Sequence, residues 1–317
     1  MTVYSLGEAF VEFVKKGGGN LATVGEFYGP FPSGAPAITA SAVSRMGGRS
    51  RLSAVVGEDE FGRAFSERLR SDGVDVSSLR YTKKRTTGMS FVSYSGDTRT
   101  FLFHARDSAT ALLKPEDVDL TDASVLHVSG SSLAMGWSMA AAVRKAIGEA
   151  AKKGVALSFD PNVRPEVMDE RTISEIRRYC QRADFLFISE EDAANLFGKL
   201  DEGSLKSMSR EAGATVVLKR GRRGATVFER GEELRVPAYR VEVVDPTGAG
   251  DWFAGSFLAA VESGKDQGWA GRFASAAAAI SVTAVSPMDG PRDLQEVVDF
   301  MNSHPQAEEE SRSPQKG

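Results

Sequence analysis

Apolar and amphipathic segments alternate along the middle and C-terminal parts of the chain. Short apolar runs predict buried strands at residues 123–130, 155–160, 184–189 and 214–219. Between these runs, apolar positions recur with helical spacing at residues 137–154, 171–183 and 190–198. Strands that alternate with helices form βαβ units, and therefore a parallel sheet with helices on both faces. Such a sheet binds its ligands beyond the carboxyl ends of its strands.

The N-terminal third has a different pattern. At residues 3–13 and 22–31, apolar and polar positions alternate among several Gly and Pro residues. Residues 86–104 predict a β-hairpin whose strands flank a Ser95-Gly96-Asp97 turn. We interpret strands drawn from about 10–31 and 86–104 as a small β-sheet lid. The helical patterns near 36–46 and 59–71 belong to the main domain.

The main domain is predicted to span residues 1–302. Residues 303–317 are polar and charged without periodicity, which predicts a disordered tail. The longest apolar-rich stretch, residues 274–285, is short and rich in alanine, so it predicts a buried helix and no membrane span. The chain opens without a basic segment followed by an apolar run, and we expect no signal peptide.

Composition narrows the functional classes. A formal net charge of −4 argues against general binding to nucleic acid or to anionic membranes. The single cysteine, Cys180, fits a reducing compartment and predicts a cytoplasmic protein. The three histidines are far apart in sequence and no HExxH or CxxC occurs, so a transition-metal site has little support.

The stretch VVDPTGAGDWFAG, residues 243–255, carries the clearest chemistry. It predicts the end of a strand at Val241–Val244, a turn, and a helix that starts near Ala249 and ends at Gly264. The amides of Gly248, Ala249 and Gly250 would then form an anion site at the helix N-terminus. A carboxylate there repels a bound phosphate, but it can deprotonate a hydroxyl that attacks phosphorus. Asp251 is therefore our candidate general base, and the alternative is a plain turn with a helix-capping acid.

This stretch resembles the D-T-x-G-A-G-D signature of the ribokinase-like (PfkB) carbohydrate kinases. Four further segments match that family in order: FPSGAPAITASAVSRMGGRSRLSAVVGEDEFGRAF, FDPNVRP, FISEEDAANLFG and VVLKRGRRGATVF. The resemblance covers about residues 1–300 and is nearest to the 2-keto-3-deoxygluconate kinase and fructokinase branch. It implies an α/β three-layer sandwich with a mainly parallel sheet of about nine strands. It also implies a β-sheet lid and a homodimer formed through the lids.

The resemblance assigns the phosphate side of the site. Asp251 matches the catalytic base, and Gly248, Ala249 and Gly250 match the anion hole. ATP and Mg²⁺ are the implied cofactors, and Asp245 matches a residue near a K⁺ site found in many members. Gly221 and Gly224 match the loop beside the nucleotide phosphates and ribose, and Asp192 stands where the family usually has Glu in N-x-x-E. Arg220 and Lys219 are candidates for positive charge beside that loop, and a solvated surface charge is the alternative for both.

On the acceptor side, Gly34 and Ala35 match the sugar-binding glycine motif. Glu12 falls where fructokinases commonly place Asp, and Asn162 and Arg164 match the family's N-x-R. Arginine clamps carboxylates and phosphates through its bidentate fork. His104 and Arg106, at the end of the lid hairpin, are further candidates for substrate contact, and ordinary exposed polarity is the alternative for both.

Three positions depart from the family pattern: Ile38, Asp192 and Trp252. Ile38 removes an amide that usually contacts sugar hydroxyls, and Trp252 is a candidate for selecting the sugar. We predict an ATP-dependent kinase for the primary hydroxyl of a ketose or keto-sugar acid, with 2-keto-3-deoxygluconate slightly favoured over fructose. The alternative is a catalytically silent sugar or nucleotide sensor, or a kinase for another sugar or nucleoside. A nicotinamide dehydrogenase is disfavoured because no G-x-G-x-x-G follows an early strand.

Overall fold

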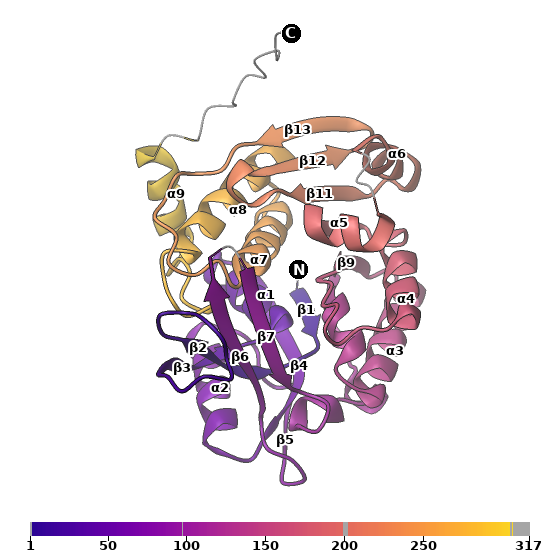
Figure 1. The fold of residues 1–317 in the computed structure, drawn as a ribbon. Coiled ribbons are helices and arrows are strands. Elements are labelled where there is room, and N and C mark those ends of the chain that lie inside the picture. The colour runs from indigo at the N-terminus through magenta and orange to yellow at the C-terminus, as the bar shows by residue number, and fades with distance from the viewer. Residues whose placement is uncertain (1, 97, 199–201, 305, 307–317) are drawn as a thin grey trace.

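A nine-stranded sheet forms the centre of the protein in the computed structural model, which describes residues 2–96, 98–198, 202–304 and 306 (Figure 1). From one edge to the other, the strands are β13 (Glu232–Val236), β12 (Ala225–Glu229), β11 (Thr215–Lys219), β10 (Phe185–Ser189), β9 (Ala156–Asp160), β8 (Val125–Ser129), β1 (Thr2–Leu6), β4 (Arg49–Gly57) and β5 (Leu79–Thr82). All neighbouring strands from β5 to β11 pair in parallel, and β12 pairs antiparallel with both β11 and β13. The apolar runs between residues 123 and 219 form the predicted strands.

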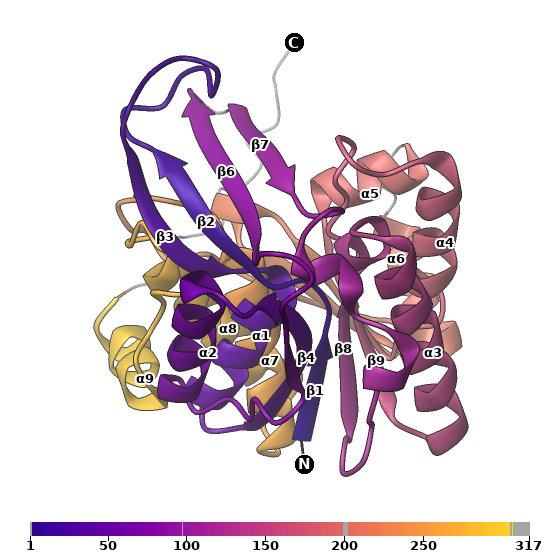
Figure 2. The same ribbon diagram turned by 90° about the horizontal axis from the view of Figure 1, so that it is seen from below.

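Helices cover both faces of this sheet (Figure 2). One layer holds α1 (Ala35–Arg45), α2 (Glu60–Ser71), α7 (Ala249–Glu262), α8 (Gln267–Ser281) and α9 (Leu294–Ser303). The other layer holds α3 (Trp137–Lys153), α4 (Glu170–Cys180), α5 (Glu190–Phe197) and α6 (Glu202–Ala212). The α/β three-layer sandwich with a mainly parallel sheet is thus confirmed.

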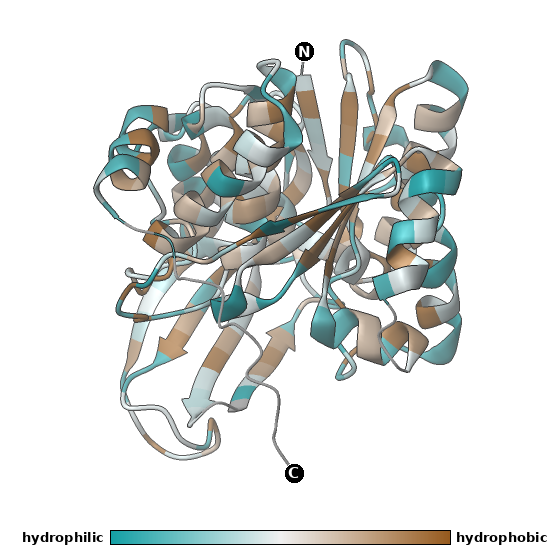
Figure 3. Ribbon diagram, turned by 90° about the horizontal axis from the view of Figure 1, so that it is seen from above, coloured by the Kyte–Doolittle hydropathy of each residue, from teal (hydrophilic) through white to brown (hydrophobic). Residues whose placement is uncertain are grey.

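The sheet strands are apolar on both faces because both are covered, and Figure 3 shows them mostly brown between helices with teal outer sides. Two buried apolar clusters result, one on each face. In the first, α1 and α7 pack so closely that a Cβ on Gly255 would lie 2.6 Å from the Cβ of Ala42. This contact fixes α7 against α1. The helix α7 starts at the sequence Gly248-Ala249-Gly250, which we call the GAG turn.

A second sheet of four strands stands beside the main domain at the carboxyl ends of its strands (Figures 1 and 2). Its order is β3 (Phe27–Ser33), β2 (Phe10–Lys15), β6 (Gly88–Ser95) and β7 (Thr98–His104). Because side chains alternate between the faces of a strand, one face of this lid is directed at the main domain and the other away from it. The predicted hairpin is formed by β6 and β7.

Some predicted bounds are wrong. Val241–Val244 is not a strand end: the segment leaves the sheet after β13, and Val243 and Val244 are 58% and 52% exposed. The amides of Val244 and Asp245 bond to the carbonyl of Val282 and to no neighbouring strand. The alanine-rich helix ends at Ser281, before the predicted residue 285. The predicted tail lies, apart from Ser303, His304 and Gln306, outside the described residues.

Candidate active site

The GAG turn begins α7 at the edge of the main domain that faces the lid. Gly248 is the N-cap of α7 with φ +83°, a left-handed conformation that glycine adopts without a steric cost. A Cβ at Gly248 would lie 2.9 Å from the carbonyl oxygen of Pro287, so backbone from another loop closes this side of the turn. The amide of Ala249 makes a 3.3 Å bond to the carbonyl of Pro246. Gly250 follows in the first turn of the helix, beside Asp251.

Asp251 is held in the first turn of α7 and lines a small cavity under the lid. Burial, and next the negative charge of Asp160, raise the pKa of this carboxyl to about 8. The nearby cations Lys219 and Arg164 oppose this shift. A carboxyl whose pKa lies close to neutrality is well matched to general-base chemistry.

A lysine lies on the other side of the turn. The ammonium of Lys219, at the end of β11, pairs with Asp160 at the end of β9. Burial alone would lower the pKa of Lys219, but the charge of Asp160 raises it above its usual value. A Cβ on Gly250 would lie 3.0 Å from Lys219 Nζ. A fixed positive charge therefore lies beside the amides that start α7.

The cavity that contains Asp251 has a volume of about 70 Å³ and lies between the lid and the main domain. Of the residues predicted to contact the acceptor, the structure brings five to its wall. They are Glu12, Gly34, Ala35, Asn162 and Arg164, and Gly248 and Ile38 also line the cavity.

The lid contributes a second arginine and an aromatic ring to this cavity. Arg99 and Phe101 are on β7, and the guanidinium carbon of Arg99 lies 4.6 Å from the centroid of the Phe101 ring. The guanidinium carbon of Arg164, from the main domain, lies 5.4 Å from the same centroid. Burial, and next the charge of Arg99, lower the pKa of Arg164. Two guanidiniums near each other favour the binding of an anion between them.

Two buried glutamates complete the cavity. Glu8 accepts hydrogen bonds from Ser131, at 2.6 Å, and from Ser132. Glu12 Oε2 accepts a 3.1 Å bond from Ser90, and burial together with the charge of Asp245 raises the pKa of Glu12 to about 7. Within the described part of the chain, Glu12 Oε1 has no hydrogen-bond partner. It can therefore accept a bond from a hydroxyl of a bound sugar.

Two predicted contacts lie elsewhere. His104 and Arg106 line a neighbouring cavity of about 440 Å³ and are not part of the wall around Asp251. Arg106 donates to the carbonyls of Ala134, at 3.2 Å, and Val167, at 2.8 Å. The alternation of β7 places His104 on the face opposite Phe101 and Phe103, away from the acceptor cavity.

The remaining predicted residues have structural partners. Asp192 forms a capping box with Ser189 at the start of α5 and accepts a 2.7 Å bond from the amide of Val163. Asp245 Oδ1 accepts bonds from Tyr94 of the lid at 2.5 Å and from the amide of Thr247 at 2.8 Å.

The glycines after β11 permit a tight turn back to the next strand. Gly221 and Gly224 have φ +55° and +83°, and the Gly224 amide bonds to the carbonyl of Gly221. A Cβ on Gly224 would lie 2.0 Å from the carbonyl oxygen of Val236. This turn follows Lys219 at the same edge of the sheet as Asp251, where the sequence predicts the nucleotide phosphates.

The sequence prediction missed several residues of the site. Glu8, Ser90, Arg99 and Phe101 line the cavity, and Asp160 pairs with Lys219. None of them was singled out, because neither an alternating pattern nor a family motif such as FDPNVRP states which of its side chains faces the site. Trp252, a candidate for selecting the sugar, is fully buried and does not line the cavity, so any influence on the sugar would be indirect.

A buried carboxyl with a raised pKa thus lies at a helix start formed by small residues, on the wall of a cavity under the lid. In a comparison with known families, residues 3–293 match the pfkB family carbohydrate kinases. The chain belongs to that family and is a carbohydrate kinase.

Among characterised relatives, it is 33% identical to 2-dehydro-3-deoxygluconokinase of Thermoproteus tenax over 94% of each chain. It is 31% identical to fructokinase-2 of Solanum habrochaites, over 81% of this chain and 80% of the relative. A candidate ribokinase II from E. coli, solved in complex with ATP and Mg²⁺, has a TM-score of 0.87 at 35% identity and covers 96% of this chain and 99% of its own. A fructokinase double mutant from Vibrio cholerae O395, solved with fructose, ADP and potassium, has a TM-score of 0.84 at 27% identity. The match covers 95% of this chain and 98% of the fructokinase chain.

Proposed function

We propose that this kinase transfers the γ-phosphoryl group of ATP to the primary hydroxyl of a keto-sugar acid, and that 2-keto-3-deoxygluconate is preferred over fructose. The observation that carries this choice is the pair of guanidiniums, Arg99 and Arg164, on the wall of the cavity that holds Asp251. A neutral ketose brings no anion to these two guanidiniums, whereas a sugar carboxylate can bind between them. The 33% identity to the Thermoproteus tenax 2-dehydro-3-deoxygluconokinase supports the same choice.

Asp251 accepts the proton of the acceptor hydroxyl as that oxygen attacks phosphorus. The backbone amides of Gly248, Ala249 and Gly250 would bind the transferred group, where negative charge develops, and the Ala249 amide would exchange its 3.3 Å bond to Pro246 for this contact. Lys219, held by Asp160, adds a positive charge on the same side. Closure of the lid over a bound acceptor would exclude water from this cavity, which would limit hydrolysis of the nucleotide.

Metal ions enter the proposal at two places. Mg²⁺ neutralises charge on the nucleotide phosphates when it is bound. Asp192 keeps its carboxylate in the α5 capping box, so we propose that any contribution to Mg²⁺ passes through water. A monovalent cation fits beside Asp245, because Oδ2 of that buried carboxylate has no hydrogen-bond partner in the described residues.

A comparison of two acceptors tests the substrate choice. We expect kcat/KM, measured by coupled ADP release, to be higher for 2-keto-3-deoxygluconate than for fructose. Arg99→Gln should lower kcat/KM for the acid about 10- to 100-fold, the effect of one lost hydrogen bond to a charged group. It should change the value for fructose by less than about twofold, since fructose carries no charge. Equal losses for both acceptors, or a preference of the parent enzyme for fructose, would contradict this choice.

Arg106→Gln serves as the matched variant. It removes an arginine from the same lid hairpin, but one whose guanidinium bonds backbone carbonyls beside the neighbouring cavity. We expect Arg106→Gln to affect both acceptors equally, so a selective loss for the acid would assign the carboxylate contact to Arg106 instead of Arg99.

We further propose that two copies pair through the outer face of the lid. Phe13, Phe27 and Phe91 form a ring cluster there, with centroids of neighbouring rings 5.2 and 5.8 Å apart. Leu102, paired with Phe91 across β6 and β7, is 53% exposed. An apolar face of this kind on a sheet is typical of contacts between subunits.

A further inference from the structure

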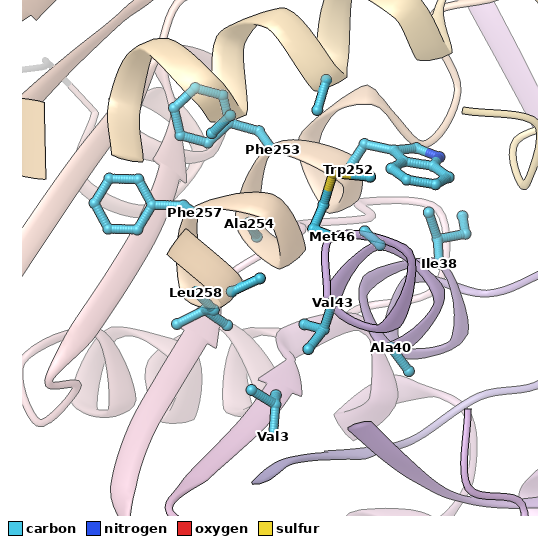
Figure 4. Packing of buried hydrophobic residues seen from close by; sticks show 14 of the residues in the cluster. Val3, Ile38, Ala40, Val43, Met46, Trp252, Phe253, Ala254, Phe257 and Leu258 are labelled. Carbon is cyan, nitrogen blue, oxygen red and sulfur yellow. The ribbon is translucent and has the colours of Figure 1, made fainter. Parts of the chain in front are cut away.

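Trp252, the residue after the base, has a role that the proposed chemistry does not use. It is the largest fully buried side chain of the described residues. Its indole points away from Phe253 and Phe257, toward α1 and Ile38 (Figure 4). The indole Nε1 donates a 3.0 Å hydrogen bond to the carbonyl of Pro287. Phenylalanine would fill much of the same space but could not make this bond.

The bonded carbonyl belongs to residues 287–291, which we call the 287–291 segment, between α8 and α9. This segment lies directly behind the anion hole, since a Cβ on Gly248 would meet the carbonyl oxygen of Pro287 at 2.9 Å. It also lies flat on the indole, because a Cβ on Gly290 would be 2.2 Å from Cε2 of Trp252. One side chain thus contacts the segment at two points, one residue from Asp251.

Two arginines hold the same segment from the other side. Arg45 of α1 donates to the carbonyls of Gly290 and Pro291, both at 3.3 Å, and its guanidinium carbon lies 5.7 Å from the centroid of the Trp252 ring. Arg68 of α2 donates to the carbonyl of Met288 and, at 2.7 Å, to the side chain of Asp289. Four of the five carbonyls of the segment therefore accept bonds from fixed side chains.

Both arginines are fixed in turn by one buried acid. Asp72, whose side chain is 2% exposed, accepts a 2.9 Å bond from Arg45 Nε and a 3.0 Å bond from Arg68 Nε. The hydroxyl of Ser41 on α1 also donates to it. A buried carboxylate that binds two guanidiniums leaves both with one strongly preferred orientation. The helices α1 and α2 thereby form a rigid backing for the 287–291 segment.

We propose that Trp252 is a positioning residue for phosphoryl transfer. Its N–H fixes the 287–291 segment against Gly248, and the segment holds the amides at the start of α7 in the direction of the transferred group. This inference rests on the proposed anion hole. Interactions that stabilise a transition state depend on preorganised donors, so a small shift of the turn lowers turnover more than it lowers ground-state binding.

The test is Trp252→Phe, measured with whichever acceptor gives ADP release. We expect kcat to fall on the order of tenfold. A 1 Å misplacement of the reacting groups costs roughly 100-fold, and the loss here should be smaller because phenylalanine keeps part of the volume of the indole ring. The KM values for ATP and acceptor should stay within about twofold, as for an interaction made only in the transition state. The affinity for ADP with aluminium fluoride, a mimic of the transferred group, should fall with kcat while the affinity for ADP alone is kept.

Trp269→Phe is the matched control, because Trp269 lies at the start of α8, where it stacks on Phe273 at a centroid distance of 4.7 Å. The kcat of Trp269→Phe should be unchanged. A Trp252→Phe enzyme with a lowered melting temperature but parental kcat and aluminium fluoride affinity would overturn the proposal, since the indole would then serve packing alone.

If Trp252→Phe does not fold, Arg45→Lys gives the same test. Lysine keeps the charge over the ring but cannot bond Asp72 and two carbonyls in the fixed geometry of a guanidinium. A parental kcat for Arg45→Lys would also overturn the proposal. If none of the acceptors tested makes the parent enzyme release ADP, the proposed function fails. The affinity for ADP with aluminium fluoride then decides alone whether Trp252 positions the anion hole.

Discussion

Asp251 shows how the position of one residue sets its chemistry. In the sequence it is an acid at a helix start, which is common. In the structure it is buried beside Asp160, and its pKa rises to about 8. Lys219 and Arg164 limit that rise, so the carboxyl remains able to ionise near neutral pH. The spacing G-A-G-D predicted this site because glycine and a helix N-terminus have local signatures, whereas Arg99 and Glu8 reach the cavity only through the tertiary fold.

Asp251→Asn should lower kcat by about 10²- to 10⁴-fold, the usual contribution of a general base, without loss of fold. Asparagine keeps the shape and removes the ability to accept the proton. A coupled assay measures the loss of kcat, and the far-ultraviolet circular dichroism spectrum shows whether the fold is kept. A folded variant with kcat within twofold of the parent would remove Asp251 from the chemistry.

The pH dependence of kcat/KM follows from the same carboxyl. A base is active only when it is deprotonated, and Asp251 has a raised pKa of about 8 in the free enzyme. We therefore expect kcat/KM to increase with pH up to about 8 and to level off above it. A profile that is already flat from pH 6 upward would show that the base ionises at a lower pH.

Among the elements, the lid shows the limits of the sequence most clearly. The hairpin of residues 86–104 could be predicted from alternation and its turn, but alternation does not state which set of side chains faces the main domain. Pairing of β6 with β7 settles this, because Ser90 and Phe103 lie on one face while Phe91 and Leu102 lie on the other. His104 falls on the outer face for the same reason, and Arg99 on the inner one. The exposed segment 241–244 was mistaken for a strand because β-branched residues in a loop look the same as in a sheet.

Tyr94→Phe tests the connection between the lid and the loop before α7. The hydroxyl of Tyr94 bonds Asp245 at 2.5 Å and Thr247 at 2.7 Å, and phenylalanine removes both bonds. We expect KM for the acceptor to rise about tenfold, since a bond to a charged group contributes about 1.5–3 kcal/mol. ATP hydrolysis without acceptor should rise as well, because water enters a less firmly closed site.

The control is Tyr28→Phe, which changes a half-exposed tyrosine of the same lid. Parental kinetics in Tyr28→Phe together with a raised KM in Tyr94→Phe would assign the effect to the hydrogen bonds of Tyr94 with Asp245 and Thr247. Identical kinetics of the two variants would show that the lid closes without the hydrogen bonds of Tyr94.

For the whole molecule, the layered fold follows from the order of strands and helices along the chain, and the sequence predicted it. The association of two molecules through the lid is a property of a surface, and it was expected from the family resemblance alone. Within the described residues, no helix is long and apolar enough to cross a membrane. In the proposed dimer, the exposed apolar side chains of the outer lid face would be removed from water.

Leu102→Glu tests that association. A carboxylate in the centre of an apolar contact loses its hydration, so the dimer should dissociate while each copy remains folded. Light scattering coupled to size exclusion should give the mass of one chain in place of two. Leu234→Glu, at a 40% exposed leucine on β13, is the control and should leave the mass unchanged. An unchanged mass for Leu102→Glu, or a monomeric parent, would contradict a lid-mediated dimer.

The strand order of the main sheet has a consequence for how the protein is made. β4 pairs with β1 and β5 with β4, and then β8 to β13 add in chain order on the other side of β1. Every strand thus joins at an open edge of what the ribosome has already released, and none must insert between paired neighbours. The helix that carries Asp251 follows the last of these strands. A nascent chain can therefore pair all the strands of the main sheet before it carries Asp251, the proposed base.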